Sequence, residues 1–286
     1  MDERFRRPIV IVKAAITRLH GLQTARSVVG ILLAAAGLFC LPTLSGAEPV
    51  SLNTDQLDPP HHALLHTILQ QLEPLITTRK ADGTANLLTW DELYQPLDEP
   101  ERAFLDAFRA LKAETLGSTS RHFGEANAPD LVPVGTQETV KDGTRATLDP
   151  QFLPRPVLDA YRAMMDAMFK DLGKRLLVES GYRAPAYQLY LFCFYLPKHG
   201  YSIRETNRFV ALPGYSEHGN PNRQAIDFIN EAGINGEDHP EEFEALPEYR
   251  WLTEHAREFG FFLSYPRDNP DHTSFEPWHW HFESGD

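Results

Sequence analysis

The chain has 286 residues, enough for one large domain or for a catalytic domain with a smaller helical one. Its formal net charge of −13 is uneven, because residues 1–47 hold six Lys/Arg and two Asp/Glu. The remainder therefore holds 21 basic and 38 acidic residues, a balance of −17. Such a surface repels phosphate backbones, so nucleic acid is excluded as an expected partner.

Residues 1–47 have the pattern of an export signal. A basic stretch precedes a 14-residue apolar run, Val28–Leu41, and the small residues Ser45-Gly46-Ala47 follow. A run of this length is short for a helix that must cross about 30 Å of hydrocarbon. We therefore predict a signal peptide cleaved after Ala47 and a protein that is exported to the periplasm or cell envelope. The protein would be membrane-anchored instead if the signal is not cleaved.

The next segment, residues 48–130, is predicted to be a helical N-terminal extension. Apolar residues spaced by three and four predict helices over 60–76 and 98–113. Residues 116–150 carry scattered Gly, Pro, Asp and Thr, which indicates a long connector.

Residues 131–286 alternate helices with short strands. Helices are predicted over 155–173, 185–196 and 247–259, the last ending at Gly260. Strands are predicted over 176–178, 225–229, 261–265 and 278–282. The predicted fold class is α+β, with a mostly antiparallel central sheet flanked by helices. Cys193 stands in an apolar helix and is predicted to be a buried thiol.

Three short segments carry the residues with chemical potential. They are Ser180-Gly181-Tyr182-Arg183, Ser216-Glu217-His218 followed by Ala225-Ile226-Asp227, and Glu276-Pro277-Trp278-His279. No Ser is followed three residues later by Lys, and neither Gly-x-Ser-x-Gly nor His-Glu-x-x-His occurs, so the usual serine and zincin signatures are missing. Two imidazoles and a carboxylate suit Zn²⁺, and three protein ligands leave a fourth position for water.

These segments resemble the D-alanyl-D-alanine metallopeptidases, in which Ser-x-His-x-x-Gly-x-Ala-x-Asp and Glu-x-Trp-His follow an upstream Ser-Gly-Tyr-Arg. The resemblance covers about residues 150–283. It implies the Hedgehog/D-Ala-D-Ala metallopeptidase fold for residues 131–286 and one zinc ion per chain. The ligands that it implies are His218, Asp227 and His279.

The same resemblance implies roles for the neighbouring residues. Glu276 would be the general base that moves a proton to the departing amine. Arg183 would bind the substrate and stabilise the oxyanion. Gln188 and Ser216 match positions that hydrogen-bond the terminal D-alanine.

Two features leave alternatives open. The family has seven steps from His to Asp, whereas His218 and Asp227 are nine apart, a difference that a loop can absorb. His279 and His281 face the same side of the predicted last strand, so His281 could be the ligand instead. The intact Glu-x-Trp-His favours His279, with His281 and Trp278 supporting the site from outside the ligand set.

The expected function is zinc-dependent D-alanyl-D-alanine carboxypeptidase activity on peptidoglycan stem peptides ending in D-Ala. No obligate protein partner is expected. An L,D-carboxypeptidase, a D,D-dipeptidase or a peptidoglycan endopeptidase could use the same zinc site. A catalytically inactive cell-wall-binding protein is the alternative from another class, favoured by the enlarged His218–Asp227 loop.

Overall fold

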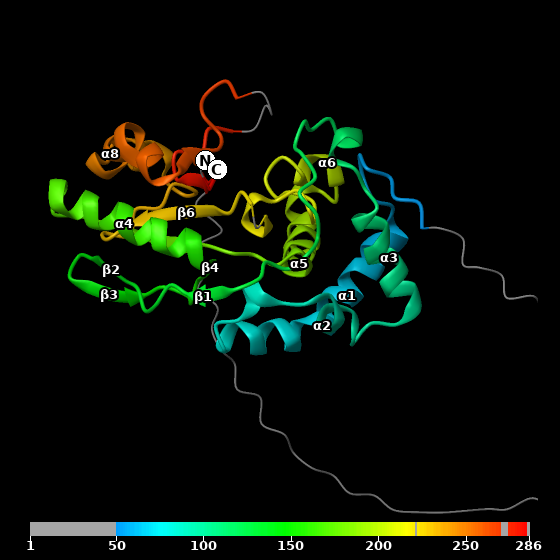
Figure 1. Cartoon of the computed structure of the whole chain (residues 1–286). Helices are drawn as coiled ribbons and strands as arrows, with labels where there is room; N and C mark the ends of the chain where they lie inside the picture. Colours follow the sequence, from blue (N-terminus) through cyan, green and yellow to red (C-terminus); the bar gives the residue numbers. More distant parts are fainter. Residues whose placement is uncertain (1–49, 221, 270–273, 285–286) are drawn as a thin grey trace, which may run out of the picture. The chain divides into compact units, whose positions relative to one another are not determined.

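A computed structural model describes residues 50–220, 222–269 and 274–284 (Figure 1). The predicted signal peptide, residues 1–47, lies outside the described residues. Within those ranges, no helix combines the length and apolar character that a membrane span needs.

The described part of the chain begins with helices, two of which have acidic N-cap residues. The N-terminal elements are α1 (Pro59–Ala81), α2 (Trp90–Tyr94) and α3 (Glu99–Arg109), with 3-10 turns at Ala85–Leu87 and Ala113–Leu116. The Asp58 carboxylate caps α1, and Asp98 with Glu101 forms a reciprocal capping box on α3. The two predicted helices are confirmed, although α1 runs five residues beyond position 76 and α3 ends at 109. The short α2 was not predicted.

The interpretation of residues 116–150 as a connector was wrong for its second half. β1 (Leu131–Pro133) pairs with β4 (Phe152–Pro154), and β2 (Glu138–Lys141) pairs with β3 (Thr144–Thr147). Asp142 and Gly143 join β2 to β3 with φ angles of 51° and 78°. Two successive positive φ angles are typical of the tight hairpin turn that Asp-Gly favours.

The main sheet has four antiparallel strands in the order β5-β6-β8-β7: β5 (Leu176–Ser180), β6 (Ala225–Asn230), β8 (His279–Phe282) and β7 (Phe261–Leu263). The remaining elements are α4 (Arg155–Leu172), α5 (Pro185–Tyr195), α6 (Ile203–Thr206), α7 (Pro240–Glu244) and α8 (Pro247–His255), with 3-10 turns at Leu196–His199, Glu217–Gly219 and Ala256–Phe259. The predicted α+β class with an antiparallel sheet and flanking helices is confirmed. Gly260 takes the left-handed conformation after the last turn, as predicted.

Side-chain alternation divides the main sheet into a core face and a site face. Val178, Ile226, Phe228 and Trp280 pack in one apolar cluster with residues of α4 and α8. Asp227 and His279 alternate with them and therefore point to the other face. Phe169 and Leu172 are apolar residues of α4 that are exposed.

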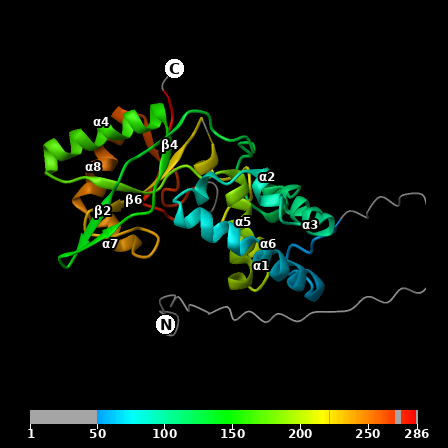
Figure 2. The same cartoon turned by 90° about the horizontal axis from the view of Figure 1, so that it is seen from below.

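A second apolar cluster joins the N-terminal helices to α5. It contains residues of α1 and α3 together with Leu189, Phe192 and Cys193 of α5, and Cys193 is buried as predicted. Both views place α1, α2, α3 and α5 beside one another, with α4, β6 and α8 on the other side (Figure 1, Figure 2). The N-terminal extension thus packs on the helix that follows Arg183.

Candidate metal centre and its surroundings

The register of the main sheet brings two of the predicted site residues together. Asp227 of β6 lies opposite Ser180 of β5 on one side and opposite His279 of β8 on the other. Directly opposed residues in antiparallel strands place their side chains next to each other on one face. The His279 Nδ1 atom accordingly lies 2.8 Å from Asp227 Oδ1.

The third predicted metal ligand, His218, lies in the 3-10 turn Glu217–Gly219. His218 Nε2 lies 3.0 Å from Asp227 Oδ2, and the His218 and His279 rings meet at 86° with centroids 4.9 Å apart. Potential ligand atoms of His218, Asp227 and His279 all lie within 4.8 Å of one another. The two additional residues between His218 and Asp227 therefore do not separate the side chains. One residue of this loop, residue 221, lies outside the described ranges.

The other nitrogen of each ring is already occupied. His218 Nδ1 lies 2.8 Å from the Gly181 carbonyl oxygen, and His279 Nε2 lies 3.1 Å from Glu217 Oε2. Such contacts fix the tautomer of a metal-binding histidine and aim its remaining nitrogen at the ion. Here the aimed atoms are His218 Nε2 and His279 Nδ1, both beside Asp227. Two imidazole nitrogens and one carboxylate form a donor set that fits Zn²⁺.

Sequence reasoning missed the role of Glu217. Its carboxylate is buried, bridging His279 to Arg223, whose Nε donates to Glu217 Oε1 over 2.6 Å. Burial opposes ionisation, but the hydrogen bond from His279 and the charges of His279 and His281 lower the pKa of Glu217 to about 2. Its position between Ser216 and His218 was visible, yet nothing in the spacing predicted that it would contact a residue 62 positions away.

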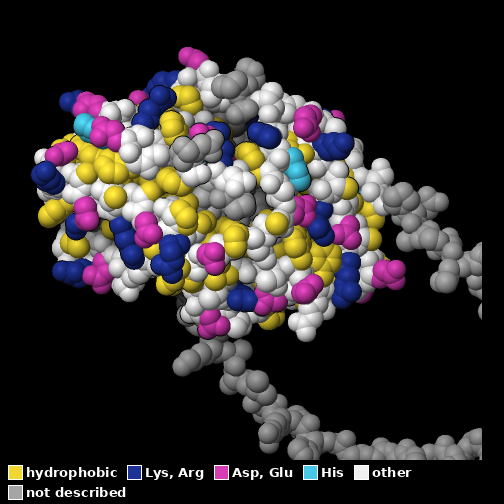
Figure 3. Space-filling model, in the orientation of Figure 1, with side chains coloured by type: hydrophobic (Ala, Val, Ile, Leu, Met, Phe, Trp, Pro, Cys, Tyr) yellow, Lys and Arg dark blue, Asp and Glu magenta, His cyan; other side chains and the backbone are white. Residues whose placement is uncertain are grey.

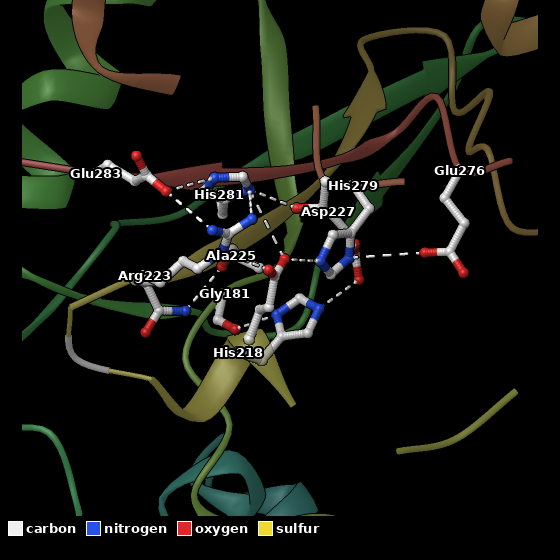
Figure 4. A network of polar contacts seen from close by, with 12 residues as sticks. Gly181, His218, Arg223, Ala225, Asp227, Glu276, His279, His281 and Glu283 are labelled. Atoms are coloured by element: carbon white, nitrogen blue, oxygen red, sulfur yellow. Dashed lines mark hydrogen bonds and ion pairs between the residues drawn. The ribbon is translucent and has the colours of Figure 1, made fainter. Parts of the chain in front are cut away.

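His281 faces away from the ion-binding atoms. Its Nδ1 lies 2.7 Å from Ser264 Oγ, and its Nε2 lies 3.2 Å from Glu283 Oε1. Figure 4 shows His281 beside Glu283 and Arg223, whereas Glu276 approaches from the opposite side of His279. The geometry thus favours His279 over His281 as the third ligand. Trp278 packs at the edge of the sheet core and against Gly236, where a β-carbon would overlap the indole ring.

Glu276 lies beside the open side of the triad. Its Oε2 atom is 3.8 Å from His279 Nδ1, and its side chain is 28% exposed. Burial, together with the nearby negative charge of Asp227, raises the pKa of Glu276 to about 7. A carboxyl group with such a pKa can both accept and release a proton near neutral pH.

Arg183 is held next to the triad by neutral groups. Its backbone N–H donates to the His218 carbonyl oxygen over 3.0 Å, and its guanidinium donates to Gln188 Oε1 and Ser180 Oγ over 3.0 and 3.1 Å. Gln188 is buried, and its amide nitrogen donates to the Ala211 carbonyl oxygen. Both amide atoms of Gln188 therefore have hydrogen-bond partners within the protein, one of which is Arg183. Ser216 lies half-buried at the start of the turn that carries His218.

Comparisons with known proteins show what the region that carries this site is similar to. Residues 151–285, which include every predicted site residue, match the model of the VanY family, described as D-alanyl-D-alanine carboxypeptidase. This part of the chain is therefore similar to that family. The matched region begins at the end of the connector and leaves out the N-terminal helices.

Three similar proteins illustrate the relationship. YodJ of Bacillus subtilis (strain 168) is 31% identical over 131 residues, covering 45% of each chain. The D-alanyl-D-alanine carboxypeptidase of Enterococcus faecium is 24% identical over 158 residues, covering 54% of this chain and 45% of that one. The structure of the LdcB LD-carboxypeptidase aligns with 55% of this chain and 69% of its own, at 25% identity and a TM-score of 0.44. The chain thus spans less than half the length of the first two relatives.

Proposed function

We propose that the protein is a zinc-dependent D-alanyl-D-alanine carboxypeptidase that trims peptidoglycan stem peptides. One observation carries the proposal: His218 Nε2, Asp227 and His279 Nδ1 converge within 4.8 Å beside Glu276, inside a region that matches the VanY family. The fixed rings and their occupied second nitrogens are what a metal site requires and what an inert wall-binding protein would not need. The sequence pattern of residues 1–47 supports export to the periplasm or cell envelope.

Different residues of the site would bind the metal, transfer the proton and stabilise the negative charge during amide hydrolysis. A zinc ion held by the triad would supply Lewis-acid chemistry and lower the pKa of water at its open position. Glu276 takes a proton at its carboxylate and returns it to the nitrogen of the departing D-alanine. Arg183 offers its guanidinium to the peptide carbonyl or carboxylate and stabilises negative charge that develops there. Gln188 and Ser180 orient Arg183, because its guanidinium donates to both of them.

Digestion of purified muropeptides tests this function. Wild-type protein should release D-alanine from pentapeptide stems, and a chelator should abolish the release, as followed by mass spectrometry. Glu276→Ala should lose turnover by about 10²-fold or more, the usual contribution of a general base, while zinc stays bound. Release of a D-Ala-D-Ala dipeptide, or cutting of cross-links, would replace the proposal with one of the related peptidases. Activity that is unchanged in chelator would contradict the metal mechanism.

A further inference from the structure

A cavity of about 220 Å³ lies between the N-terminal extension and the catalytic region. One wall is built from the end of α1 and the turn after it, including Lys80, Gly83 and Asn86. The facing wall includes Asp149 from the connector and Ser180 and Arg183 from the segment after β5. The extension lies outside the part of the chain that matches the VanY family, so the family pattern assigns no role to this wall.

The cavity adjoins the candidate metal centre. Ser180 is the cross-strand neighbour of Asp227, and the backbone N–H of Arg183 donates to the carbonyl oxygen of His218. The segment that carries Ser180 and Arg183 therefore lines the cavity and also contacts two of the residues that carry the ion-binding atoms.

The extension is fastened to this site by backbone contacts. The Ala184 N–H donates to the Asn86 carbonyl oxygen over 2.8 Å, next to Arg183. At the far end the two walls touch, since a β-carbon built on Gly83 would overlap the Pro150 ring. Gly83 also has a φ of +66°, where a side chain would be strained. These contacts fix the extension as one wall of the cavity.

The lining is cationic. Its charged residues are Lys80, Arg183 and Asp149, a balance of one positive charge. Within the described residues, the guanidinium of Arg183 donates to the neutral Gln188 and Ser180, and neither it nor Lys80 has an ion pair with a carboxylate. Two cations that line one cavity without a carboxylate ion pair favour a carboxylate ligand.

We propose that this cavity binds the C-terminal residue of the peptide substrate and that Lys80, supplied by the extension, is a specificity-determining residue for a free α-carboxylate. The inference rests on the proposed function and sharpens it. The N-terminal extension is then part of the substrate site.

The test compares one peptide in two forms: an N-acylated peptide ending in D-Ala-D-Ala with a free carboxylate, and the same peptide with a C-terminal amide. Lys80→Met should raise KM for the free-carboxylate form about three- to fivefold, near the upper worth of a partly exposed ion pair. Lys80→Glu should raise it by about tenfold or more, because it adds repulsion. KM for the amide should change less than twofold, and Lys80→Arg should restore the wild-type value.

Lys141→Met on the β2–β3 hairpin is the matched control, since Lys141 is an exposed lysine that does not line the cavity. Equal KM values for wild type, Lys80→Met and Lys80→Glu on the free-carboxylate peptide would overturn the inference while leaving the proposed function intact. If the wild type cleaves neither peptide, the proposed function fails. Calorimetry then measures binding of the free-carboxylate peptide, which tests separately whether the cavity binds the carboxylate. Weaker binding by Lys80→Glu would then support the cavity, and equal binding would overturn it.

Discussion

At the scale of single residues, the site depends on the Glu217 carboxylate, which contacts the His279 ring nitrogen that does not face Asp227. Glu217 accepts a hydrogen bond from His279 Nε2 and is itself held by Arg223. Glu217→Gln should lower zinc affinity by about 10- to 100-fold, because His279 then loses the charged partner that aims its Nδ1 atom. Competition with a chelator of known affinity measures this change. Exposed Glu231 is the matched control, and Glu231→Gln should leave zinc affinity unchanged. Wild-type affinity in Glu217→Gln would refute the role of Glu217.

A second carboxyl group, Glu179 on β5, predicts how stability varies with pH. Burial raises the pKa of Glu179 to about 7, against a hydrogen bond from Asn235 over 2.9 Å. The folded state therefore holds a proton that the unfolded state releases near its ordinary pKa of about 4.3. This contribution to the unfolding free energy is fully present below that ordinary pKa and is lost as pH rises through about 7.

Urea denaturation of zinc-free protein between pH 4.5 and pH 8 checks the effect. The unfolding free energy of Glu179→Gln relative to wild type should rise with pH, since the amide carries no charge to bury. A difference that stays constant across the range would show that Glu179 keeps an ordinary pKa in the folded protein.

At the scale of elements, the packing of α3 against α5 ties the extension to the catalytic region. Phe108 of α3 is fully buried, and its ring centroid lies 6.0 Å from that of Phe192 on α5. Phe108→Ala should reduce the unfolding free energy by about 3–5 kcal/mol, the usual cost of deleting a buried aromatic ring. Chemical denaturation gives the value. Phe209→Ala is the control, because Phe209 is 63% exposed and should cost little. Equal losses in both variants would argue against this contact.

Elements with a strong hydrophobic period could be predicted from the sequence, and those set by turns or tertiary contacts could not. The stripe of α4 and the four strands of the main sheet follow apolar spacing, so their positions agree within a few residues. The β2–β3 hairpin has an Asp-Gly signal, but its strands are exposed and carry no apolar alternation. Phe169 and Leu172 fit the helical period yet are exposed, which the period alone does not predict.

In the candidate site, too, some residues could be predicted from sequence patterns, whereas the contacts of others depend on the tertiary structure. His218, Asp227, His279 and Glu276 stand in recognisable spacings; the sheet register brings Asp227 and His279 together, and the turn Glu217–Gly219 adds His218. The contact of Glu217 with His279 depends on how a turn lies against a distant strand, which no local pattern encodes. The placement of Gln188 behind Arg183 is likewise a matter of side-chain direction within the fold.

At the scale of the whole molecule, the extension and the region that matches the VanY model belong to one compact unit, Ala47–Asp286. The α5 helix shares its apolar cluster with α1 and α3, and its first residues follow Arg183 directly. On the face seen in Figure 3, the described acidic and basic side chains are interspersed.

The central claim is that His218, Asp227 and His279 hold one ion between them. Metal analysis of the purified full-length protein, loaded with zinc and then freed of loosely bound metal, tests it most directly. The account predicts one zinc per chain in wild type and in Glu276→Ala, and almost none in Asp227→Ala or His279→Ala, with His281→Ala retaining the metal. Stoichiometric zinc in both Asp227→Ala and His279→Ala, or none in the wild type, would contradict it.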